Sequence, residues 1–199
     1  MIHIGNNGYL KIIVGPMFSG KTSELITISR LYKRCEISVC IINYSGDTRY
    51  GHSNILTTHD NIMIPCISLD SLETILSSES FLKNKVILIN EAQFFEDLYI
   101  VVKKLVEDHN KIVYICGLDG DYRRESFGDI LKLIPLCDEI TKKHAICNFC
   151  KNGNRGIFTK RLTNETKQKM IGYENYESVC RKCFKKKQFK SINKKNINE

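Results

Sequence analysis

Short runs of apolar residues recur along the first 120 positions and alternate with stretches of helical periodicity. The runs lie at residues 9–14, where Lys11 is the one charged position, and at 39–42, 86–89 and 112–116. Between them, apolar side chains recur at helical spacing over residues 21–34 and 98–106, which predicts two helices. Strands that are apolar along their whole length are typical of a parallel sheet covered on both faces. The pattern therefore predicts an α/β domain with a central parallel sheet over residues 1–140.

The remaining segments are less regular. Residues 44–59 are polar and contain two glycines, so we expect a loop there, followed by a strand at 62–67 and a short helix at 71–77. From residue 141 onward, Lys, Asn, Gly and paired Cys dominate. We expect a second, smaller domain over residues 141–186. A basic tail without fixed structure should follow over 187–199, because Lys/Asn runs lack the apolar partners that folding needs.

A phosphate-binding motif lies between the first strand and the first helix. Residues 15–22 read Gly-Pro-Met-Phe-Ser-Gly-Lys-Thr and match the P-loop pattern G-x-x-x-x-G-K-S/T at every defined position. Its glycines let backbone N–H groups turn toward phosphate oxygens, and the helix N-terminus adds partial positive charge. Lys21 would reach the β- and γ-phosphates, and the Thr22 hydroxyl can ligate Mg²⁺. The predicted triphosphate site comprises Gly15, Pro16, Met17, Phe18, Ser19, Gly20, Lys21 and Thr22.

A P-loop usually works with an acidic residue at the end of a second buried strand, which holds Mg²⁺ through water. Here the run at 86–89 is followed by Asn90 and Glu91. Glu91 is well placed to act as a base. Asn90 occupies the metal-binding position, where it keeps one acceptor oxygen but has lost the negative charge.

Two Cys-x-x-Cys pairs predict a metal site in the second domain. Cys147, Cys150, Cys180 and Cys183 fit a tetrahedral four-thiolate Zn²⁺ site of the structural kind. The 29 residues between the pairs, 151–179, form a longer gap than in a simple zinc ribbon, so the metal should pin the base of a long loop. That loop contains glycines and is expected to act as a lid over a small ligand. Redox-active pairs are the alternative, but no thioredoxin-like pattern surrounds them.

Composition and charge narrow the class of protein. The longest apolar stretches are far shorter than the roughly 20 residues of a membrane-spanning helix, and no basic start precedes an apolar block. We therefore expect an intracellular protein. Residues 141–199 carry 16 Lys+Arg and 4 Asp+Glu, in a chain with a formal net charge of +8. Such a basic region could serve nucleic acid, an acidic membrane or a polyphosphate, although we expect the tail itself to be solvated.

Taken together, these motifs resemble one family, the type II, zinc-containing thymidine kinases. The matching stretches follow the family order over residues 9–184. They are GPMFSGKT at 15–22, DTRY at 47–50, EAQFF at 91–95, LDG at 118–120, FG at 127–128, TKRL at 159–162 and SVCR at 178–181, followed by Cys183. The fold implied is a RecA-like P-loop domain with a small zinc-binding domain that carries a long loop, called the lasso.

The resemblance implies transfer of the γ-phosphate of ATP to the 5′-hydroxyl of thymidine, with Glu91 as general base. Asp47 and Arg49 would close over the donor phosphates. The implied thymidine pocket consists of Met17, Phe94, Leu118, Tyr122, Phe127, Thr159 and Tyr176. Family members use Mg²⁺ with ATP and a structural Zn²⁺, are commonly homotetramers and are inhibited by dTTP. The resemblance also implies a cytoplasmic protein, in the host cytoplasm if the source is viral, with no membrane or nucleic-acid partner.

Two departures from the family pattern bear on these expectations. Asn90 stands where the family has Asp, and the lasso is one residue shorter near 172–176, where the family tends to have two glycines. The first departure leaves open a catalytically weakened or inactive nucleotide-binding homologue. A further alternative is a P-loop ATPase stimulated by nucleic acid, which the basic C-terminal region would serve. Against it, the lysines are not interleaved with an aromatic-rich surface of the kind that stacks bases.

Overall fold

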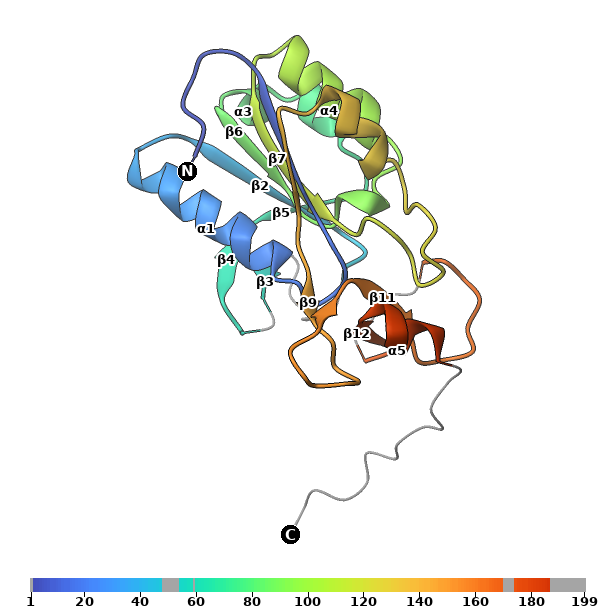
Figure 1. Ribbon diagram of the computed structural model, residues 1–199. Coiled ribbons are helices and arrows are strands. Elements are labelled where there is room, and N and C mark those ends of the chain that lie inside the picture. Colours follow the sequence, from blue (N-terminus) through green and yellow to red (C-terminus); the bar gives the residue numbers. More distant parts are fainter. Residues whose placement is uncertain (1, 48–53, 59, 170–173, 187–199) are drawn as a thin grey trace.

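The computed structural model describes residues 2–47, 54–58, 60–169 and 174–186, with a β-sheet flanked by helices and a smaller module at one end of it (Figure 1). The main sheet has six strands in the order β5-β2-β6-β7-β1-β8, and every neighbouring pair is parallel. These strands are β1 (Tyr9–Val14), β2 (Val39–Tyr44), β5 (Ile67–Leu69), β6 (Val86–Ile89), β7 (Ile112–Gly117) and β8 (Glu139–Lys142). The predicted central parallel sheet is confirmed.

Helices cover both faces of this sheet, one group on each side (Figure 1). On one face, α1 (Lys21–Arg34) buries Leu25 among the inward side chains of β6 and β7. On the other face lie α4 (Leu98–Glu107), with Leu105 buried, and the 3₁₀ helix η2 (Ile130–Leu136). Successive side chains of a strand point to opposite faces, so apolar strands such as β6 contribute to both buried clusters. This double burial explains why the strands read as continuous apolar runs.

The segment between β2 and β6 differs from the expectation. The loop expected at 44–59 contains a strand, β3 (Ile55–Thr57), which pairs antiparallel with β4 (Met63–Pro65). The single strand expected at 62–67 is wrong, because the run is divided between β4 and β5, which belong to different sheets. Pro65 ends β4, since proline has no N–H to continue a hydrogen-bonded ladder.

Two short helices follow β5. The helix expected at 71–77 is shorter, α2 (Glu73–Leu76), and α3 (Glu79–Leu82) was not predicted. A helix of one turn carries too few residues to show a periodic pattern. Within the part of the chain that the structure describes, no helix has both the length and the apolar character needed to cross a membrane.

The C-terminal module begins directly after β8. Its elements are β9 (Ala145–Ile146), β10 (Arg155–Gly156), β11 (Phe158–Arg161), β12 (Tyr176–Val179) and α5 (Arg181–Lys185). β9 pairs with β10 and β11 pairs with β12, both antiparallel. The boundary expected at residue 140 falls inside β8, which pairs with β1 as far as Lys142. β8 is an edge strand with mostly exposed side chains, so it has no apolar signature in the sequence.

Gly128 lies where the fold has no room for a side chain. Its φ of 59° is left-handed, and a Cβ there would lie 2.2 Å from the carbonyl oxygen of Gln93. Gly153 also has a left-handed φ, 82°, but nothing lies within 4 Å of its Cβ position. We expect Gly128→Ala to lower the free energy of unfolding by about 2 kcal/mol more than Gly153→Ala, because overpacking adds roughly 1–3 kcal/mol to the backbone strain that both share. Urea denaturation of the two variants measures the difference, and equal losses would contradict the steric explanation.

Candidate active site

The P-loop joins the end of β1 to the start of α1. Gly20 takes a left-handed φ of 74° and lets α1 begin at Lys21, whose first turn leaves backbone N–H groups for an anion. The loop is closed on itself, since Ser19 Oγ and Lys21 Nζ both donate to the Pro16 carbonyl, at 2.8 and 2.7 Å. A phosphate oxygen offers the Lys21 ammonium a charged acceptor in place of this neutral one, and charge-assisted hydrogen bonds are stronger.

Asn90 follows β6 and lies against the P-loop helix. Its side chain is buried, and its Oδ1 accepts hydrogen bonds from Thr22 Oγ1 at 3.2 Å and from Cys116 Sγ at 3.0 Å. Burial raises the pKa of the Cys116 thiol to about 12, so this thiol keeps the proton that it donates. The Nδ2 of Asn90 donates to Asn43 Oδ1 on β2, at 2.8 Å. An uncharged amide therefore occupies the place beside the P-loop threonine where P-loop proteins usually have an aspartate.

Glu91 lies at the sharp turn between β6 and the 3₁₀ helix η1 (Ala92–Phe94). Its φ of 51° is left-handed, a conformation that costs a non-glycine residue free energy and is frequent at functional sites. Gln93 Nε2 donates to Glu91 Oε2 at 2.7 Å, and Gln93 Oε1 accepts from the Leu118 N–H at 3.0 Å. Gln93 thereby fixes the Glu91 carboxylate against the end of β7.

One cavity of about 260 Å³ lies between the P-loop, the carboxyl ends of the central strands and the lasso, residues 151–179. It brings together most residues expected in the site: Met17, Phe18, Ser19, Gly20, Lys21, Thr22, Asp47, Glu91, Phe94, Leu118, Tyr122, Thr159 and Tyr176. The residues predicted to bind the phosphates and those predicted to bind the thymine therefore line the same cavity.

The other expected residues are placed differently. The first two residues of the P-loop do not line the cavity, and neither does Phe127. Phe127 is buried and packs edge-on against Phe94, with ring centroids 5.3 Å apart, so it supports the wall that Phe94 forms. Arg49 and residues 172–173 of the shortened lasso segment lie outside the described residues.

Seven lining residues were not assigned to the site from sequence: Ser23, Thr57, Thr58, Asp60, Gly120, Asp121 and Gln168. Thr57 and its neighbour fall in a segment read as a loop, and no motif marks them. Asp121 directly follows the LDG stretch, and that adjacency is the signal that could have drawn attention to it. Gln168 lies in a polar run with no pattern to distinguish it.

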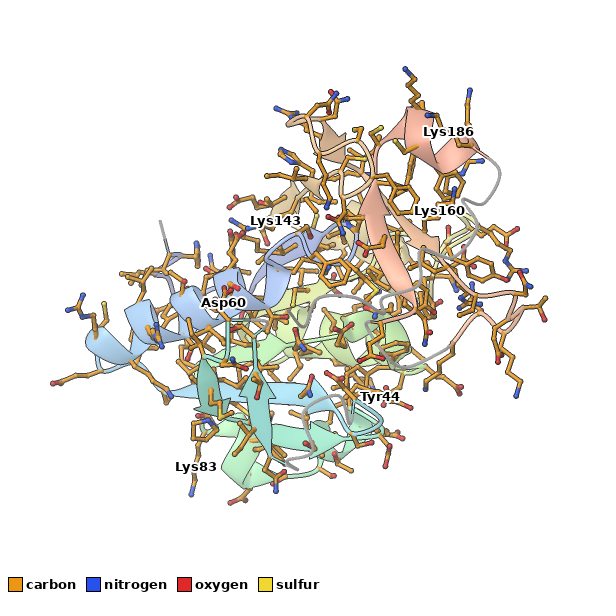
Figure 2. All side chains as sticks on the ribbon, turned by 90° about the horizontal axis from the view of Figure 1, so that it is seen from below. Tyr44, Asp60, Lys83, Lys143, Lys160 and Lys186 are labelled. Carbon is orange, nitrogen blue, oxygen red and sulfur yellow. The ribbon has the colours of Figure 1, made fainter. Side chains whose placement is uncertain are left out.

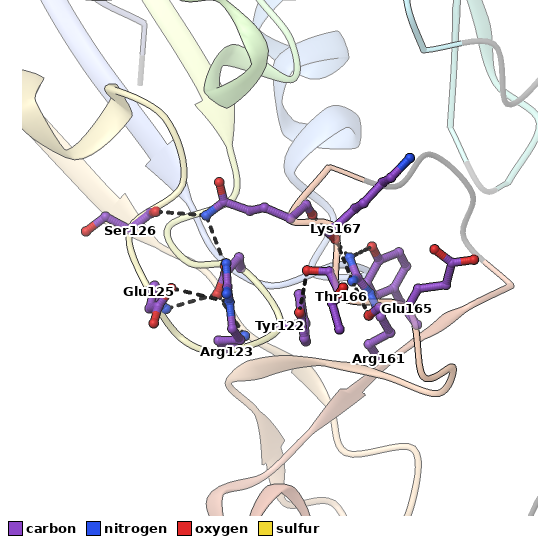
Figure 3. A network of polar contacts seen from close by, with 11 residues as sticks. Tyr122, Arg123, Glu125, Ser126, Arg161, Glu165, Thr166 and Lys167 are labelled. Atoms are coloured by element: carbon purple, nitrogen blue, oxygen red, sulfur yellow. Dashed lines mark hydrogen bonds and ion pairs between the residues drawn. The ribbon is translucent and has the colours of Figure 1, made fainter.

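Arg161 of β11 organises the lasso (Figure 3). Its guanidinium donates hydrogen bonds of 2.6–3.1 Å to the carbonyls of Glu165, Lys167 and Gln168 and to the hydroxyl of Tyr176. It also lies over the ring of Tyr122, 3.7 Å from the centroid. Although Arg161 is only 5% exposed, its charge is thus matched by carbonyl dipoles and an aromatic face. No pattern in the sequence predicts this role of Arg161.

Hydrogen bonds also join the lasso to the P-loop domain. They run from Met17 N to Thr159 Oγ1 (3.0 Å), from Gln168 Nε2 to Asp121 Oδ2 (3.0 Å) and from the Tyr122 hydroxyl to the Thr166 carbonyl (2.9 Å). In addition, Lys169 donates to the Tyr44 hydroxyl and lies over the ring of that tyrosine. The lasso is therefore closed over the cavity in this structure.

The four paired cysteines meet at the base of the lasso. Their Sγ atoms all lie within 4.8 Å of one another, and Cys150 Sγ is 4.0 Å from Cys180 Sγ. Thiolates at about 2.3 Å from a tetrahedral zinc stand roughly 3.8 Å apart, so the cluster could hold Zn²⁺ with little rearrangement. The Lys160 ammonium fastens the adjoining hairpin to α5 by donating to the carbonyls of Cys183, Phe184 and Lys186. Figure 2 labels Lys160 and Lys186 in this C-terminal module.

Comparison of the sequence with known proteins shows the family to which the chain belongs. A sequence profile described as thymidine kinase matches residues 8–184. The chain belongs to the thymidine kinase family. It is 40% identical to the thymidine kinase of sheeppox virus (strain KS-1) over 178 residues, which cover 89% of this chain and 97% of the relative.

It is also 41% identical to a thymidine kinase of Oryza sativa subsp. japonica over 185 residues, covering 87% of this chain and 65% of the relative. Among solved structures, domain III of the Thermotoga maritima replication initiation protein DnaA matches with a TM-score of 0.40 and 16% identity, over 69% of this chain and 55% of that one. A likeness at that level carries no argument about function. Family membership therefore rests on the profile and the curated relatives.

We expect this thymidine kinase to bind one zinc ion per chain and to lose it in Cys180→Ser, because a structural zinc site needs all four ligands. Elemental analysis of the purified full chain by plasma mass spectrometry measures the stoichiometry. Cys35→Ser is the control, since Cys35 is exposed and outside the cluster. Zinc that survives Cys180→Ser, or is lost in Cys35→Ser, would show that the cluster is not the metal site.

The lowered pKa of Asp121, which the lasso residue Gln168 contacts, predicts that the stability of the folded chain depends on pH. Burial alone would raise the pKa of its carboxyl, but hydrogen bonds from Gln168 and from the backbone N–H groups of Arg123 and Glu125 outweigh burial and lower the pKa. A lowered pKa in the folded state contributes stability that is complete above the ordinary carboxyl value, near 4, and is lost as the pH falls through the folded value.

We expect Asp121→Asn to be less stable than the parent kinase by about 1–2 kcal/mol at pH 7, because one amide oxygen replaces two charged acceptors. The difference should hold down to about pH 5 and shrink below pH 4. Thermal unfolding of both proteins across this range checks the prediction. Asp129→Asn is the control, since Asp129 is outside the cavity. A stability difference that grows on acidification would contradict the assignment.

Proposed function

We propose that this member of the thymidine kinase family transfers the γ-phosphate of ATP to the 5′-hydroxyl of thymidine and so forms dTMP. The observation that carries the proposal is the single cavity in which the P-loop, Glu91 and the lasso residues Thr159 and Tyr176 share walls. A triphosphate on the P-loop and a nucleoside under the lasso would lie within reach of each other in that cavity.

In this reaction the thymidine 5′-oxygen bonds to the γ-phosphorus while the bond from that phosphorus to the β–γ bridging oxygen breaks, and ADP leaves. Glu91 accepts the hydroxyl proton. Because the transition state is loose, the positioning of the two substrates contributes more than the strength of the base. Gln93 serves positioning as well, since it holds the Glu91 carboxylate through a 2.7 Å hydrogen bond.

The donor phosphates would be held by the P-loop backbone and by the Lys21 ammonium, with Asp47 and Arg49 closing over them. Mg²⁺ prefers oxygen ligands, and the Thr22 hydroxyl and the Asp47 carboxylate at this end of the cavity fit that preference, with Asn90 Oδ1 hydrogen-bonded to Thr22 beside them. When bound, Mg²⁺ neutralises charge on the transferring phosphates.

The thymine would lie between apolar walls formed by Met17, Phe94, Leu118 and Tyr122, with Phe127 packed behind Phe94. The lasso covers this end of the cavity and limits the access of water, which would compete with thymidine as phosphate acceptor. Zinc at its base would keep the lasso in place and take no part in the chemistry.

Further properties come to this chain only by family membership: homotetramer formation, inhibition by dTTP, a cytoplasmic location and no nucleic-acid partner. We also keep the division into a P-loop domain, a zinc and lasso domain and a basic tail as a proposal, with the first boundary after β8 rather than at residue 140. No observation favours a catalytically inactive homologue or a nucleic-acid-stimulated ATPase over the kinase.

The test is formation of dTMP from radiolabelled thymidine by the zinc-loaded full chain with ATP and Mg²⁺. Glu91→Gln should lower turnover by about 100-fold or more, because general-base catalysis contributes at least that much in many enzymes, while ATP affinity stays nearly unchanged. Glu96→Gln is the control, since Glu96 is exposed and outside the cavity. Full turnover in Glu91→Gln would remove Glu91 from its role, and the absence of dTMP with the unmodified chain would overturn the kinase proposal.

A further inference from the structure

Asn90, directly after β6, is a neutral side chain at a position where P-loop proteins usually have an aspartate that holds the metal. Asn90 is 2% exposed, and both ends of its amide are used. Its oxygen accepts from the Thr22 hydroxyl and the Cys116 thiol, so its nitrogen has to face the other way, toward Asn43. The two donors on one side therefore settle the orientation of the Asn90 amide.

Asn43 lies beside Asn90 on the neighbouring strand and is also buried, with 5% exposure. The backbone fixes this pairing, because the Asn90 N–H donates to the carbonyl of Ile42 at 2.9 Å. Asn43 Oδ1 accepts a hydrogen bond from Asn90 Nδ2. The Asn43 Nδ2 therefore faces the opposite way, toward the residues that follow β2. There it lies 3.5 Å from Asp47 Oδ2.

A chain of polar contacts thus leads from the P-loop threonine through two amides to a carboxylate. Asp47 lines the cavity together with Thr22 and the P-loop lysine, so its carboxylate borders the same space that a triphosphate would enter. Because Asn90 contributes no charge, the carboxylates among the described cavity residues are those of Asp47, Asp60, Glu91 and Asp121. Glu91 is held by Gln93, Asp121 is held by the lasso and Asp60 is exposed, whereas Asp47 is the carboxylate that the amide pair reaches.

We propose that Asp47, oriented by Asn43, supplies the carboxylate that holds the nucleotide's Mg²⁺ in this chain. The negative charge that Asn90 lacks then comes from the segment that follows the neighbouring strand β2. Asn43 is then a positioning residue, which acts on the metal through Asp47. The inference rests on the proposed function, because a metal is needed at this end of the cavity only to accompany a triphosphate.

The amide pair makes two arrangements mutually exclusive. An aspartate at position 90 has no N–H to offer Asn43 Oδ1, so the Asn43 amide would turn over and donate to that aspartate instead of Asp47. The Asn43 Nδ2 group can donate either to an aspartate at position 90 or to Asp47, but not to both. The metal would bind to whichever carboxylate Asn43 orients. Asp47→Asn and Asn90→Asp should therefore compensate each other rather than add.

The experiment measures binding of Mn²⁺, as a paramagnetic substitute for Mg²⁺, to the zinc-loaded full chain with ATP and without thymidine. Asp47→Asn should weaken metal binding by about 10-fold or more, and Asn43→Leu should weaken it in the same direction, because partners of metal ligands are typically worth 10–100-fold in affinity. The double variant Asp47→Asn/Asn90→Asp should return to within about threefold of the parent, which also shows that the fold is intact.

Asp70→Asn is the matched control. It makes the same change in a carboxylate after the adjacent strand β5, where Asp70 accepts from Ser45 outside the cavity, and it should bind metal like the parent. Parent-like metal binding in Asp47→Asn, or a double variant as weak as Asp47→Asn alone, would overturn the inference. Because thymidine is absent from this measurement, its outcome is independent of whether the parent forms dTMP.

Discussion

The hydrogen bond from the Met17 N–H to Thr159 Oγ1 joins two parts of the chain that are otherwise built separately, and the cavity depends on that junction. The parallel sheet fixes the P-loop, since β1 is paired on both sides. The cysteine cluster and Arg161 fix the lasso from the other side. One hydrogen bond contributes only about 1 kcal/mol net, so the junction needs the additional contacts at Asp121 and Tyr122 to keep the cavity closed.

The amide at position 90 is the main chemical peculiarity of the site. An aspartate beside Thr22 would be a buried charge that calls for a metal or a donor, whereas Asn90 is satisfied by Thr22, Cys116 and Asn43 in the protein itself. The neutral residue therefore stabilises the nucleotide-free site, in which a buried carboxylate would be costly. Attraction for the metal then has to come from another carboxylate, which is the role inferred for Asp47.

The sequence was informative wherever a pattern is local. Consecutive apolar residues predicted β1, β2, β6 and β7, and the P-loop and the cysteine pairs predicted their own clustering because those motifs carry fixed spacings. The edge strand β8 and the short β3–β4 hairpin were missed, since exposed or very short strands lack an apolar signature. Arg161, Asn43 and the Gln168–Asp121 contact were missed for a different reason. Their roles arise from partners that only folding brings together, as with Gln168 and Asp121, which are separated by 47 residues in the sequence.

The central claim is that the lasso and the P-loop bind two different substrates in one cavity. Hydrogen–deuterium exchange of the zinc-loaded full chain, with thymidine alone and with ATP and Mg²⁺ alone, tests it most directly. Thymidine should slow exchange of the backbone N–H groups of residues 118–122 and 159–169, and the nucleotide should slow exchange at 19–24. Unchanged exchange of the lasso segment with thymidine, or protection of the same segments by both ligands, would contradict a shared cavity with separate sites.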